Sequence, residues 1–295
     1  MRRAYADTRF GQVHHVEHGA GAPVLLLHQT PRSWDEYRDV LPLLGRTRRA
    51  IAMDTLGFGA SAAPEEAWTI ELFAEGVLEL CADLGLTSVD LVGHHTGGVV
   101  ALEVAAAQPS LVRSLVLSGV PFVDADRRRR VAARPPIDEV DAPRDGAHLA
   151  ALWRARLPYY PADRPDLLDR LVRDALVAGE RVEEGHRAVN AYRMEERIGR
   201  VTAPALVVCG EFDEFSRPDV PRLTAALPDV EATPLEGVGV AAVDADPVQF
   251  AAVVEAFLGR IDRRSGNGAP AAARAAAHPE AGPAGVPTTR TETEQ

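Results

Sequence analysis

Residues 89–98 read VDLVGHHTGG, an apolar run that ends in a turn of small residues. Residues 99–108 follow with a helical pattern, so the segment predicts a strand, a sharp turn and a helix. Gly93 and Gly97 lie two positions on either side of His95, where glycine allows a strained turn to hold the central side chain above a cavity. The sequence therefore makes His95 the centre of a candidate site.

Strand and helix patterns alternate on both sides of this segment. Buried strands are predicted by continuous apolar runs at 23–28, 49–54, 114–121 and 204–210. Helices are predicted by apolar residues at helical spacing in 33–44, 69–84, 218–227 and 247–258. The first of these helices has Ser33 as its N-cap and Glu36 in place for a capping box. A hairpin at 9–17 and a strand near 230–235 complete an α/β fold, a mostly parallel central sheet with helices on both faces.

The strand pattern stops between residues 122 and 200. Prolines and helical patterns, among them 148–157 and 167–178, predict a helical lid inserted between two parts of the core, 1–121 and 201–261. Residues 262–295 are rich in alanine, proline, glycine and threonine, so we predict a disordered tail there.

Composition excludes several kinds of function. All 32 basic residues are arginine, and the absence of lysine excludes a Schiff-base lysine, a pyridoxal phosphate anchor and a Walker lysine. The net charge of −11 argues against nucleic-acid or anionic-membrane partners. The run Arg127–Arg130 is the exception, and we interpret it as the solvated face of a helix that opens the insertion. No cofactor is predicted.

The sequence also bears on the compartment. No apolar stretch is long enough to span a bilayer, and none follows the N-terminal residues as in a signal peptide, so we expect a cytoplasmic protein. Cys81 and Cys209 have no spacing typical of a zinc site or a disulfide framework, and we expect two buried thiols. The oligomeric state is not predicted.

Four local features, taken in order, resemble the α/β-hydrolase superfamily over roughly residues 9–258. They are the segments HQTP at 28–31, DTLGFGAS at 54–61, GHHTG at 93–97 and GEFD at 210–213. In that superfamily the chain order is nucleophile, acid, histidine. The resemblance implies that His95 occupies the position of the nucleophile and Asp213, or less favourably Glu214, that of the acid.

The resemblance breaks down at two of the three catalytic positions. Histidine replaces the nucleophilic serine, and Val240 stands where the catalytic histidine is expected, with no histidine between His186 and His278. A serine acyl-enzyme mechanism needs a hydroxyl activated by an imidazole. We therefore expect ordinary serine esterase activity to be absent.

The oxyanion hole does not depend on these residues. By resemblance its donors are the backbone N–H groups of Thr30 and Thr96, although Gln29 replaces the glycine that is usual in the family. His95 then has two interpretations. It is either a general acid or base whose tautomer Asp213 sets, or a structural replacement for serine that hydrogen-bonds to Asp213.

Further residues are candidates for contact with substrate, each with packing as the alternative. They are His28, Gln29, His94, His148, Trp153 and Tyr159. His186 and Tyr160 in the insertion belong with them as weaker candidates. No metal site is predicted, because His28, His94, His95 and Asp213 lack the paired spacing of metal ligands.

These observations lead to one preferred function and two alternatives. The preferred function is an enzyme that uses His95 and Asp213 for proton transfer on a small carbonyl-containing molecule, as a lyase, decarboxylase, cyclase or isomerase. The first alternative is a hydrolase in which His95 activates water. The second is a non-catalytic protein that binds a small ligand in the same cavity.

Overall fold

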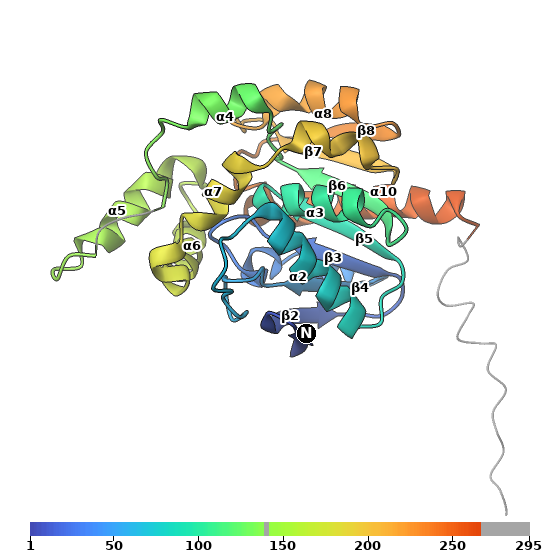
Figure 1. Ribbon diagram of the computed structural model, residues 1–295, viewed down its shortest axis with the longest axis horizontal. Helices are drawn as coiled ribbons and strands as arrows, with labels where there is room; N and C mark the ends of the chain where they lie inside the picture. The colour runs from blue at the N-terminus through green and yellow to red at the C-terminus, as the bar shows by residue number, and fades with distance from the viewer. Residues whose placement is uncertain (139–141, 267–295) are drawn as a thin grey trace, which may run out of the picture.

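The computed structural model describes residues 1–138 and 142–266 (Figure 1). Its centre is a sheet of eight strands in the order β1-β2-β4-β3-β5-β6-β7-β8. The strands are β1 (Arg2–Thr8), β2 (Gly11–His18), β3 (Pro23–Leu27), β4 (Arg49–Met53), β5 (Val89–His94), β6 (Val112–Ser118), β7 (Ala205–Gly210) and β8 (Val230–Leu235). Only the pairs β1–β2 and β2–β4 are antiparallel. The predicted mostly parallel sheet is confirmed.

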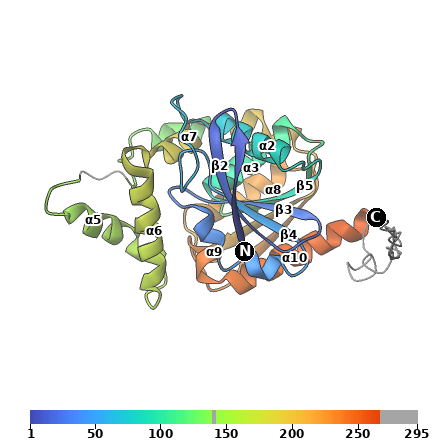
Figure 2. The same ribbon diagram turned by 90° about the horizontal axis from the view of Figure 1, so that it is seen from below.

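Helices cover both faces of the sheet, as predicted. Alternate residues of β3 explain this, because Leu25 and Leu27 belong to one hydrophobic core, and Val24 and Leu26 to the other. The first core packs under α2 (Ile70–Asp83), α3 (Thr96–Ala107) and α8 (Val220–Ala226). The second packs under α1 (Leu41–Leu44), α9 (Ala242–Ala245) and α10 (Pro247–Arg264). Figure 2 shows α2 and α3 on one side of the sheet and α9 and α10 on the other.

The candidate site lies where the central parallel strands end. The carboxyl ends of parallel strands meet at one edge of a sheet, which is where such folds bind ligands. The pairings of β5 with β3 and β6, and of β6 with β7, bring the loops after these four strands to that edge. Segments near residues 28, 95, 119 and 211 therefore lie close together.

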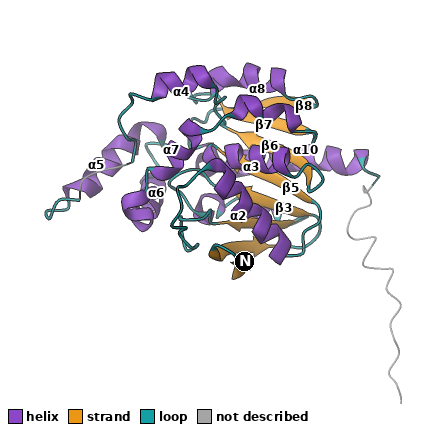
Figure 3. Ribbon diagram, viewed as in Figure 1, coloured by secondary structure: helices purple, strands orange, loops and turns teal. Residues whose placement is uncertain are grey.

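The chain between β6 and β7 is helical in its described residues. It contains α4 (Ala125–Val131), α5 (Ala147–Arg156), α6 (Pro165–Ala178), α7 (Glu184–Ala191) and several short 3-10 turns. Figure 3 shows α5 and α6 standing away from the sheet, while α4 and α7 lie nearer to it. The helical patterns predicted at 148–157 and 167–178 correspond to α5 and α6.

Two predicted boundaries differ from the structure. The helix expected over 33–44 is a 3-10 turn (Trp34–Tyr37) and the short α1. Pro42 explains the break, since proline has no N–H and its ring excludes the carbonyl four residues earlier. Ser33 caps the turn as predicted, but the Glu36 carboxylate bonds to Gln29 instead of completing a capping box.

The C-terminal helix is longer than predicted. α10 runs to Arg264, past the expected end of the core at residue 261. The rest of the predicted disordered tail, from residue 267 onward, lies outside the described residues. Among the described helices, none combines the length and apolar character that crossing a membrane requires.

Candidate functional site

His95 sits in a strained turn between β5 and α3. Its φ of 45° lies in the left-handed region, and it is the only non-glycine residue with positive φ in the described part of the chain. Glycine is required around it, because a Cβ at Gly93 would overlap the carbonyl of Gly97, and one at Gly97 the carbonyl of Leu27. The close approach of the turn to the sheet therefore explains both glycines, and the strained backbone keeps His95 the leading candidate for a functional residue.

The imidazole of His95 faces two acceptors through the same nitrogen. Its Nε2 lies 3.7 Å from Oδ2 of Asp213 and 3.4 Å from the carbonyl oxygen of Val240. Because a carboxylate and a carbonyl can only accept, Nε2 carries the proton and Nδ1 the lone pair. Nδ1 makes no hydrogen bond with the described residues. Asp213 is itself buried, and its Oδ1 accepts two backbone N–H groups at 3.0 Å each.

Val240 contributes a backbone carbonyl where the resemblance led us to expect a catalytic histidine. His94 Nε2 donates to this carbonyl at 3.1 Å, and His94 Nδ1 lies 3.0 Å from the hydroxyl of Ser118. Burial lowers the pKa of His94 to about 4. The pKa of His95 is also lowered, by burial first and by the neighbouring His94 second, although the charge of Asp213 opposes this. Both rings are therefore neutral at pH 7.

The loop after β3 brings a second set of donors to the site. The N–H of Thr30 points at Oγ1 of Thr96, 3.4 Å away, and the N–H of Thr96 opens α3 without a hydrogen-bond partner among the described residues. The loop is held from behind, because Gln29 donates its N–H and side-chain amide to Glu36 at 2.9 and 2.6 Å. His28 donates to the Gln29 carbonyl at 2.8 Å, which completes the support.

A buried charge network ties this loop to the insertion. Arg32 is fully buried and donates to Asp174 of α6 at 3.0 Å and to Asp244 of α9. Arg170 of α6 donates in turn to Asp35 at 2.6 Å. Breaking a buried ion pair leaves an uncompensated charge, so these contacts fix the insertion against the core.

A cavity of about 700 Å³ opens at this edge of the sheet. Six of the predicted residues line it, namely Gln29, Thr30, His95, Thr96, Tyr159 and the weaker candidate His186. The structure does not bring the other candidates to its wall.

Five predicted site residues lie behind or away from the cavity. His28 and His94 are buried and do not line the cavity, and the same holds for Asp213, although its neighbours His95, Phe215 and Ser216 do line it. His148 and Trp153 lie on α5, where Trp153 packs beside the apolar cluster of Tyr160 and lines a separate surface pocket. His148 and Trp153 were candidates for contact with substrate, with packing as the alternative, and they do not reach the cavity because α5 stands away from the sheet.

Arginine is the feature of the cavity that the sequence interpretation missed. Arg127 and Arg128 line the cavity, whereas we had interpreted the whole run 127–130 as a solvated face. Only Arg129 and Arg130 are exposed. The position of the run just after a central strand was the available signal, since loops at that edge converge on the site.

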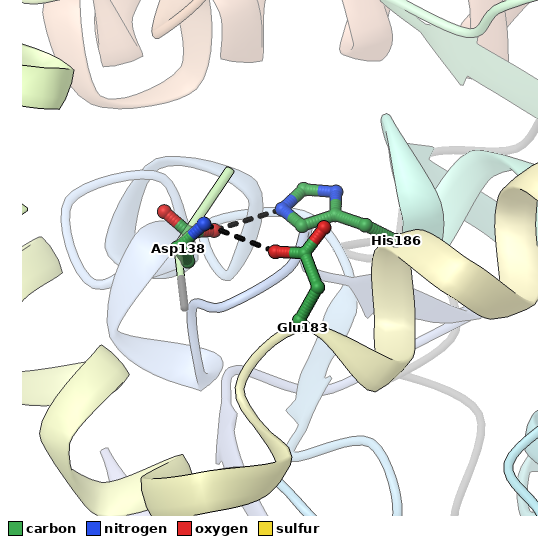
Figure 4. A group of neighbouring side chains, drawn as sticks. All are labelled: Asp138, Glu183 and His186. Atoms are coloured by element: carbon green, nitrogen blue, oxygen red, sulfur yellow. Dashed lines mark hydrogen bonds and ion pairs between the residues drawn. The ribbon is translucent and has the colours of Figure 1, made fainter. Parts of the chain in front are cut away.

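A cluster of polar side chains forms part of the insertion wall (Figure 4), and we call it the insertion cluster: Asp138, Glu183, His186 and Arg156. His186 Nε2 lies 2.8 Å from Asp138 Oδ2, and Glu183 accepts the N–H groups of residues 137 and 138 at 3.0 Å. Within residues 1–138 and 142–266 this is the only group of three or more candidate metal ligands.

The insertion cluster already contains a cation. Arg156 donates to both oxygens of Asp138, through Nε at 2.8 Å and through Nη2, and its Nη2 lies 3.4 Å from His186 Nε2. A guanidinium in this place satisfies the carboxylate that a metal ion would use. The arrangement therefore supports the cavity wall through hydrogen bonds.

Comparison with known proteins identifies the family of the fold. The family described as the alpha/beta hydrolase fold matches residues 22–236. Haloalkane dehalogenase 2 of Mycobacterium tuberculosis is 30% identical over 238 residues, which cover 76% of this chain and 83% of the relative. The 2-hydroxymuconate semialdehyde hydrolase of a Pseudomonas strain is 37% identical over 105 residues, 34% of this chain and 37% of the relative.

Solved structures show the same fold. The enol-lactonase of Burkholderia xenovorans superposes with a TM-score of 0.71 at 21% identity, covering 86% of this chain and 99% of that one. The match over residues 22–236, the extent of the similarity to the dehalogenase and the strand order lead to one conclusion. This chain belongs to the α/β-hydrolase family.

Proposed function

We propose that the protein is a hydrolase in which His95 activates water against a small carbonyl-containing organic molecule, without a serine nucleophile. The observation that carries this proposal is the orientation of the His95 ring. Its Nε2–H faces Asp213 and the Val240 carbonyl, which leaves the lone pair of Nδ1 without a partner on a residue that lines the cavity. A neutral imidazole with a free lone pair is a general base.

The proposed reaction uses the two threonine amides as well. Nδ1 of His95 takes a proton from water while the water oxygen bonds to the carbonyl carbon. The N–H groups of Thr30 and Thr96 stabilise the resulting oxyanion, a contribution that is typically worth about 3 kcal/mol for one donor in enzymes. When the tetrahedral intermediate collapses, the leaving group departs with the proton held by His95. Asp213, 3.7 Å from Nε2, stabilises the imidazolium that exists between these steps.

Two lines of support favour hydrolysis over the reaction types preferred from sequence. One relative is named a hydrolase of a semialdehyde, and one of the similar solved structures is named an enol-lactonase. These names support the hydrolytic alternative better than a lyase, decarboxylase, cyclase or isomerase. The helical segment 122–200 would act as a lid over the core of residues 1–121 and 201–261. Such a lid would exclude bulk water from the reacting groups.

The experiment is an ester panel measured in ¹⁸O-labelled water. Wild-type protein should release 4-nitrophenolate from 4-nitrophenyl acetate, butyrate or hexanoate and place the label in the acid product. His95→Gln should lower kcat/KM by roughly a hundredfold to ten-thousandfold, the usual contribution of a general base. Asp213→Asn should lower it less. His18→Gln, at the end of β2 and outside the cavity lining, is the matched control.

Three outcomes decide between the alternatives. Undiminished turnover by His95→Gln would overturn the mechanism. Ester binding without turnover by the wild type would favour the non-catalytic ligand-binding protein. Conversion of a substrate without incorporation of ¹⁸O would contradict hydrolysis and favour a lyase or isomerase.

A further inference from the structure

The polar residues on the two sides of the cavity come from different parts of the chain. Thr30, His95 and Thr96 come from the loops of the core, at the ends of the central strands. The arginines all come from the insertion and are Arg127, Arg128, Arg134, Arg156 and Arg187. Among the described residues that line the cavity, Glu183 is the only acid. A positive wall stands out in a chain with a net charge of −11.

Three of these arginines are engaged in the architecture of the insertion. Arg128 donates to the carboxylate of Glu195 at 3.0 Å and to the Tyr192 carbonyl at 2.9 Å. Arg156 is bound to Asp138 in the insertion cluster, and Arg187 is paired with Glu184 at 3.0 Å. Their donors serve the protein itself, so they are not the candidates for binding a ligand.

Arg127 and Arg134 are different. The nearest acid to Arg127 is Asp219, 3.6 Å from Nη1, which is too far for a hydrogen bond, and the Nε of Arg127 is buried without a partner. Asp219 is also shared, because its Oδ2 accepts the N–H of Phe122 at 3.0 Å and its Oδ1 faces Arg222 at 3.6 Å. Arg134 makes no side-chain hydrogen bond or ion pair with the described residues.

The charges around Arg127 also favour an anion beside it. Burial lowers the pKa of Arg127, and repulsion from Arg134 and Arg130 adds to this effect, against the opposing charge of Asp219. Two guanidinium groups on one wall repel each other, and an anion between them would remove that repulsion and fill their unused donors. A planar carboxylate fits because guanidinium donors match its two oxygens.

We infer that Arg127 and Arg134 form a carboxylate-binding subsite, and that the substrate is a carbonyl compound with an acid group at the end away from the reacting carbon. The choice of reacting carbon rests on the proposed function, whereas anion binding does not. The carbonyl would face His95 on the core side of the cavity, and the carboxylate would face the arginines on the insertion side. A cavity of about 700 Å³ is large enough for such a molecule.

Two esters that differ only in charge test the inference. They are 4-nitrophenyl hydrogen glutarate and 4-nitrophenyl pentanoate, which have acyl chains of equal length. Wild-type protein should prefer the anionic ester in kcat/KM by roughly tenfold to a hundredfold, as expected for hydrogen bonds to a charged group. The Arg127→Gln/Arg134→Gln double variant should lose this preference. Arg130→Gln, exposed on the same helix and outside the lining, should keep it.

Calorimetric titration with glutarate, and with glutaramide as the neutral control, separates this inference from the proposed function. Glutarate should bind the wild type and Arg130→Gln, and its affinity for the double variant should fall at least tenfold while the melting temperature shows that the variant is folded. If neither ester is cleaved, the proposed function fails and this titration still decides the subsite. Equal affinity in the double variant, or an unchanged ester preference, would overturn the inference.

Discussion

Replacing His94 by glutamine should change how the stability of the protein depends on pH. His94 is buried between Ser118 and the Val240 carbonyl, and burial lowers its pKa from the ordinary value of 6.5 to about 4. Between these two values the unfolded chain binds a proton at this residue and the folded chain does not. The free energy of unfolding therefore falls as the pH falls from 6.5 toward 4.

The size of this loss of stability follows from the lowered pKa of His94. Acidification from about pH 7.5 to about pH 5 should cost the wild type about 2 kcal/mol through His94 alone, because the folded form resists protonation over most of that range. Asp244 works in the opposite direction, since burial raises its pKa to about 6. The comparison with His94→Gln cancels this contribution. His95 does not cancel, because His94 helps to lower its pKa, and the substitution therefore adds to the difference in the same direction.

Urea denaturation of both proteins at the two pH values measures the difference. The wild type should lose about 2 kcal/mol more than His94→Gln on acidification, and equal m-values would show that the denatured states are comparable. The glutamine variant should be less stable at neutral pH, because it disturbs two buried hydrogen bonds. An equal acid-induced loss in both proteins, or an NMR titration of His94 near its ordinary pKa, would refute the reasoning.

Four other predictions follow from the site. Gly119→Ala should cost about 1–2 kcal/mol of stability, measured by urea denaturation, because residue 119 has a φ of 58°. The same substitution should slow ester turnover, because the new Cβ would lie 3.1 Å from His95 Nε2 and 3.2 Å from Asp213 Oδ2. Glu36→Ala should cost about 2–3 kcal/mol, again by urea denaturation, since it leaves two buried donors of Gln29 unpaired. In a pH–rate profile, kcat/KM should fall on the acid side with a midpoint well below 6.5, because His95 must be neutral and burial lowers its pKa. Dialysis against EDTA should leave the melting temperature unchanged, because an arginine already occupies the insertion cluster.

Much of the fold could be predicted because its signals are local. A buried parallel strand needs a continuous apolar run, and a helix needs apolar residues on one face. The glycines at 93 and 97 also carry local information, since a turn that passes this close to the sheet admits no side chain. The helix expected at 33–44 shows the limit, because Glu36 helps to hold the loop at Gln29 and Pro42 interrupts the helix.

The site was predictable only in part. His95 and Asp213 follow central strands, so their proximity could be expected from a parallel sheet. The expectation for Trp153 and His148 had no such basis, because helices of an insertion can pack in many directions. Nothing in the local pattern distinguished Arg127 from its exposed neighbours in the same run.

The sequence by itself determined the parallel sheet and the strained turn at His95, and it predicted the absence of a serine mechanism, since each depends on residue types at fixed short spacings. Only the tertiary structure decided that the Val240 carbonyl binds both histidines, that Asp213 leaves the Nδ1 lone pair free, and that Arg127 lines the cavity. These features depend on distances between groups up to 146 residues apart, as in the contact of His94 with Val240, and strand pairing and packing set such distances.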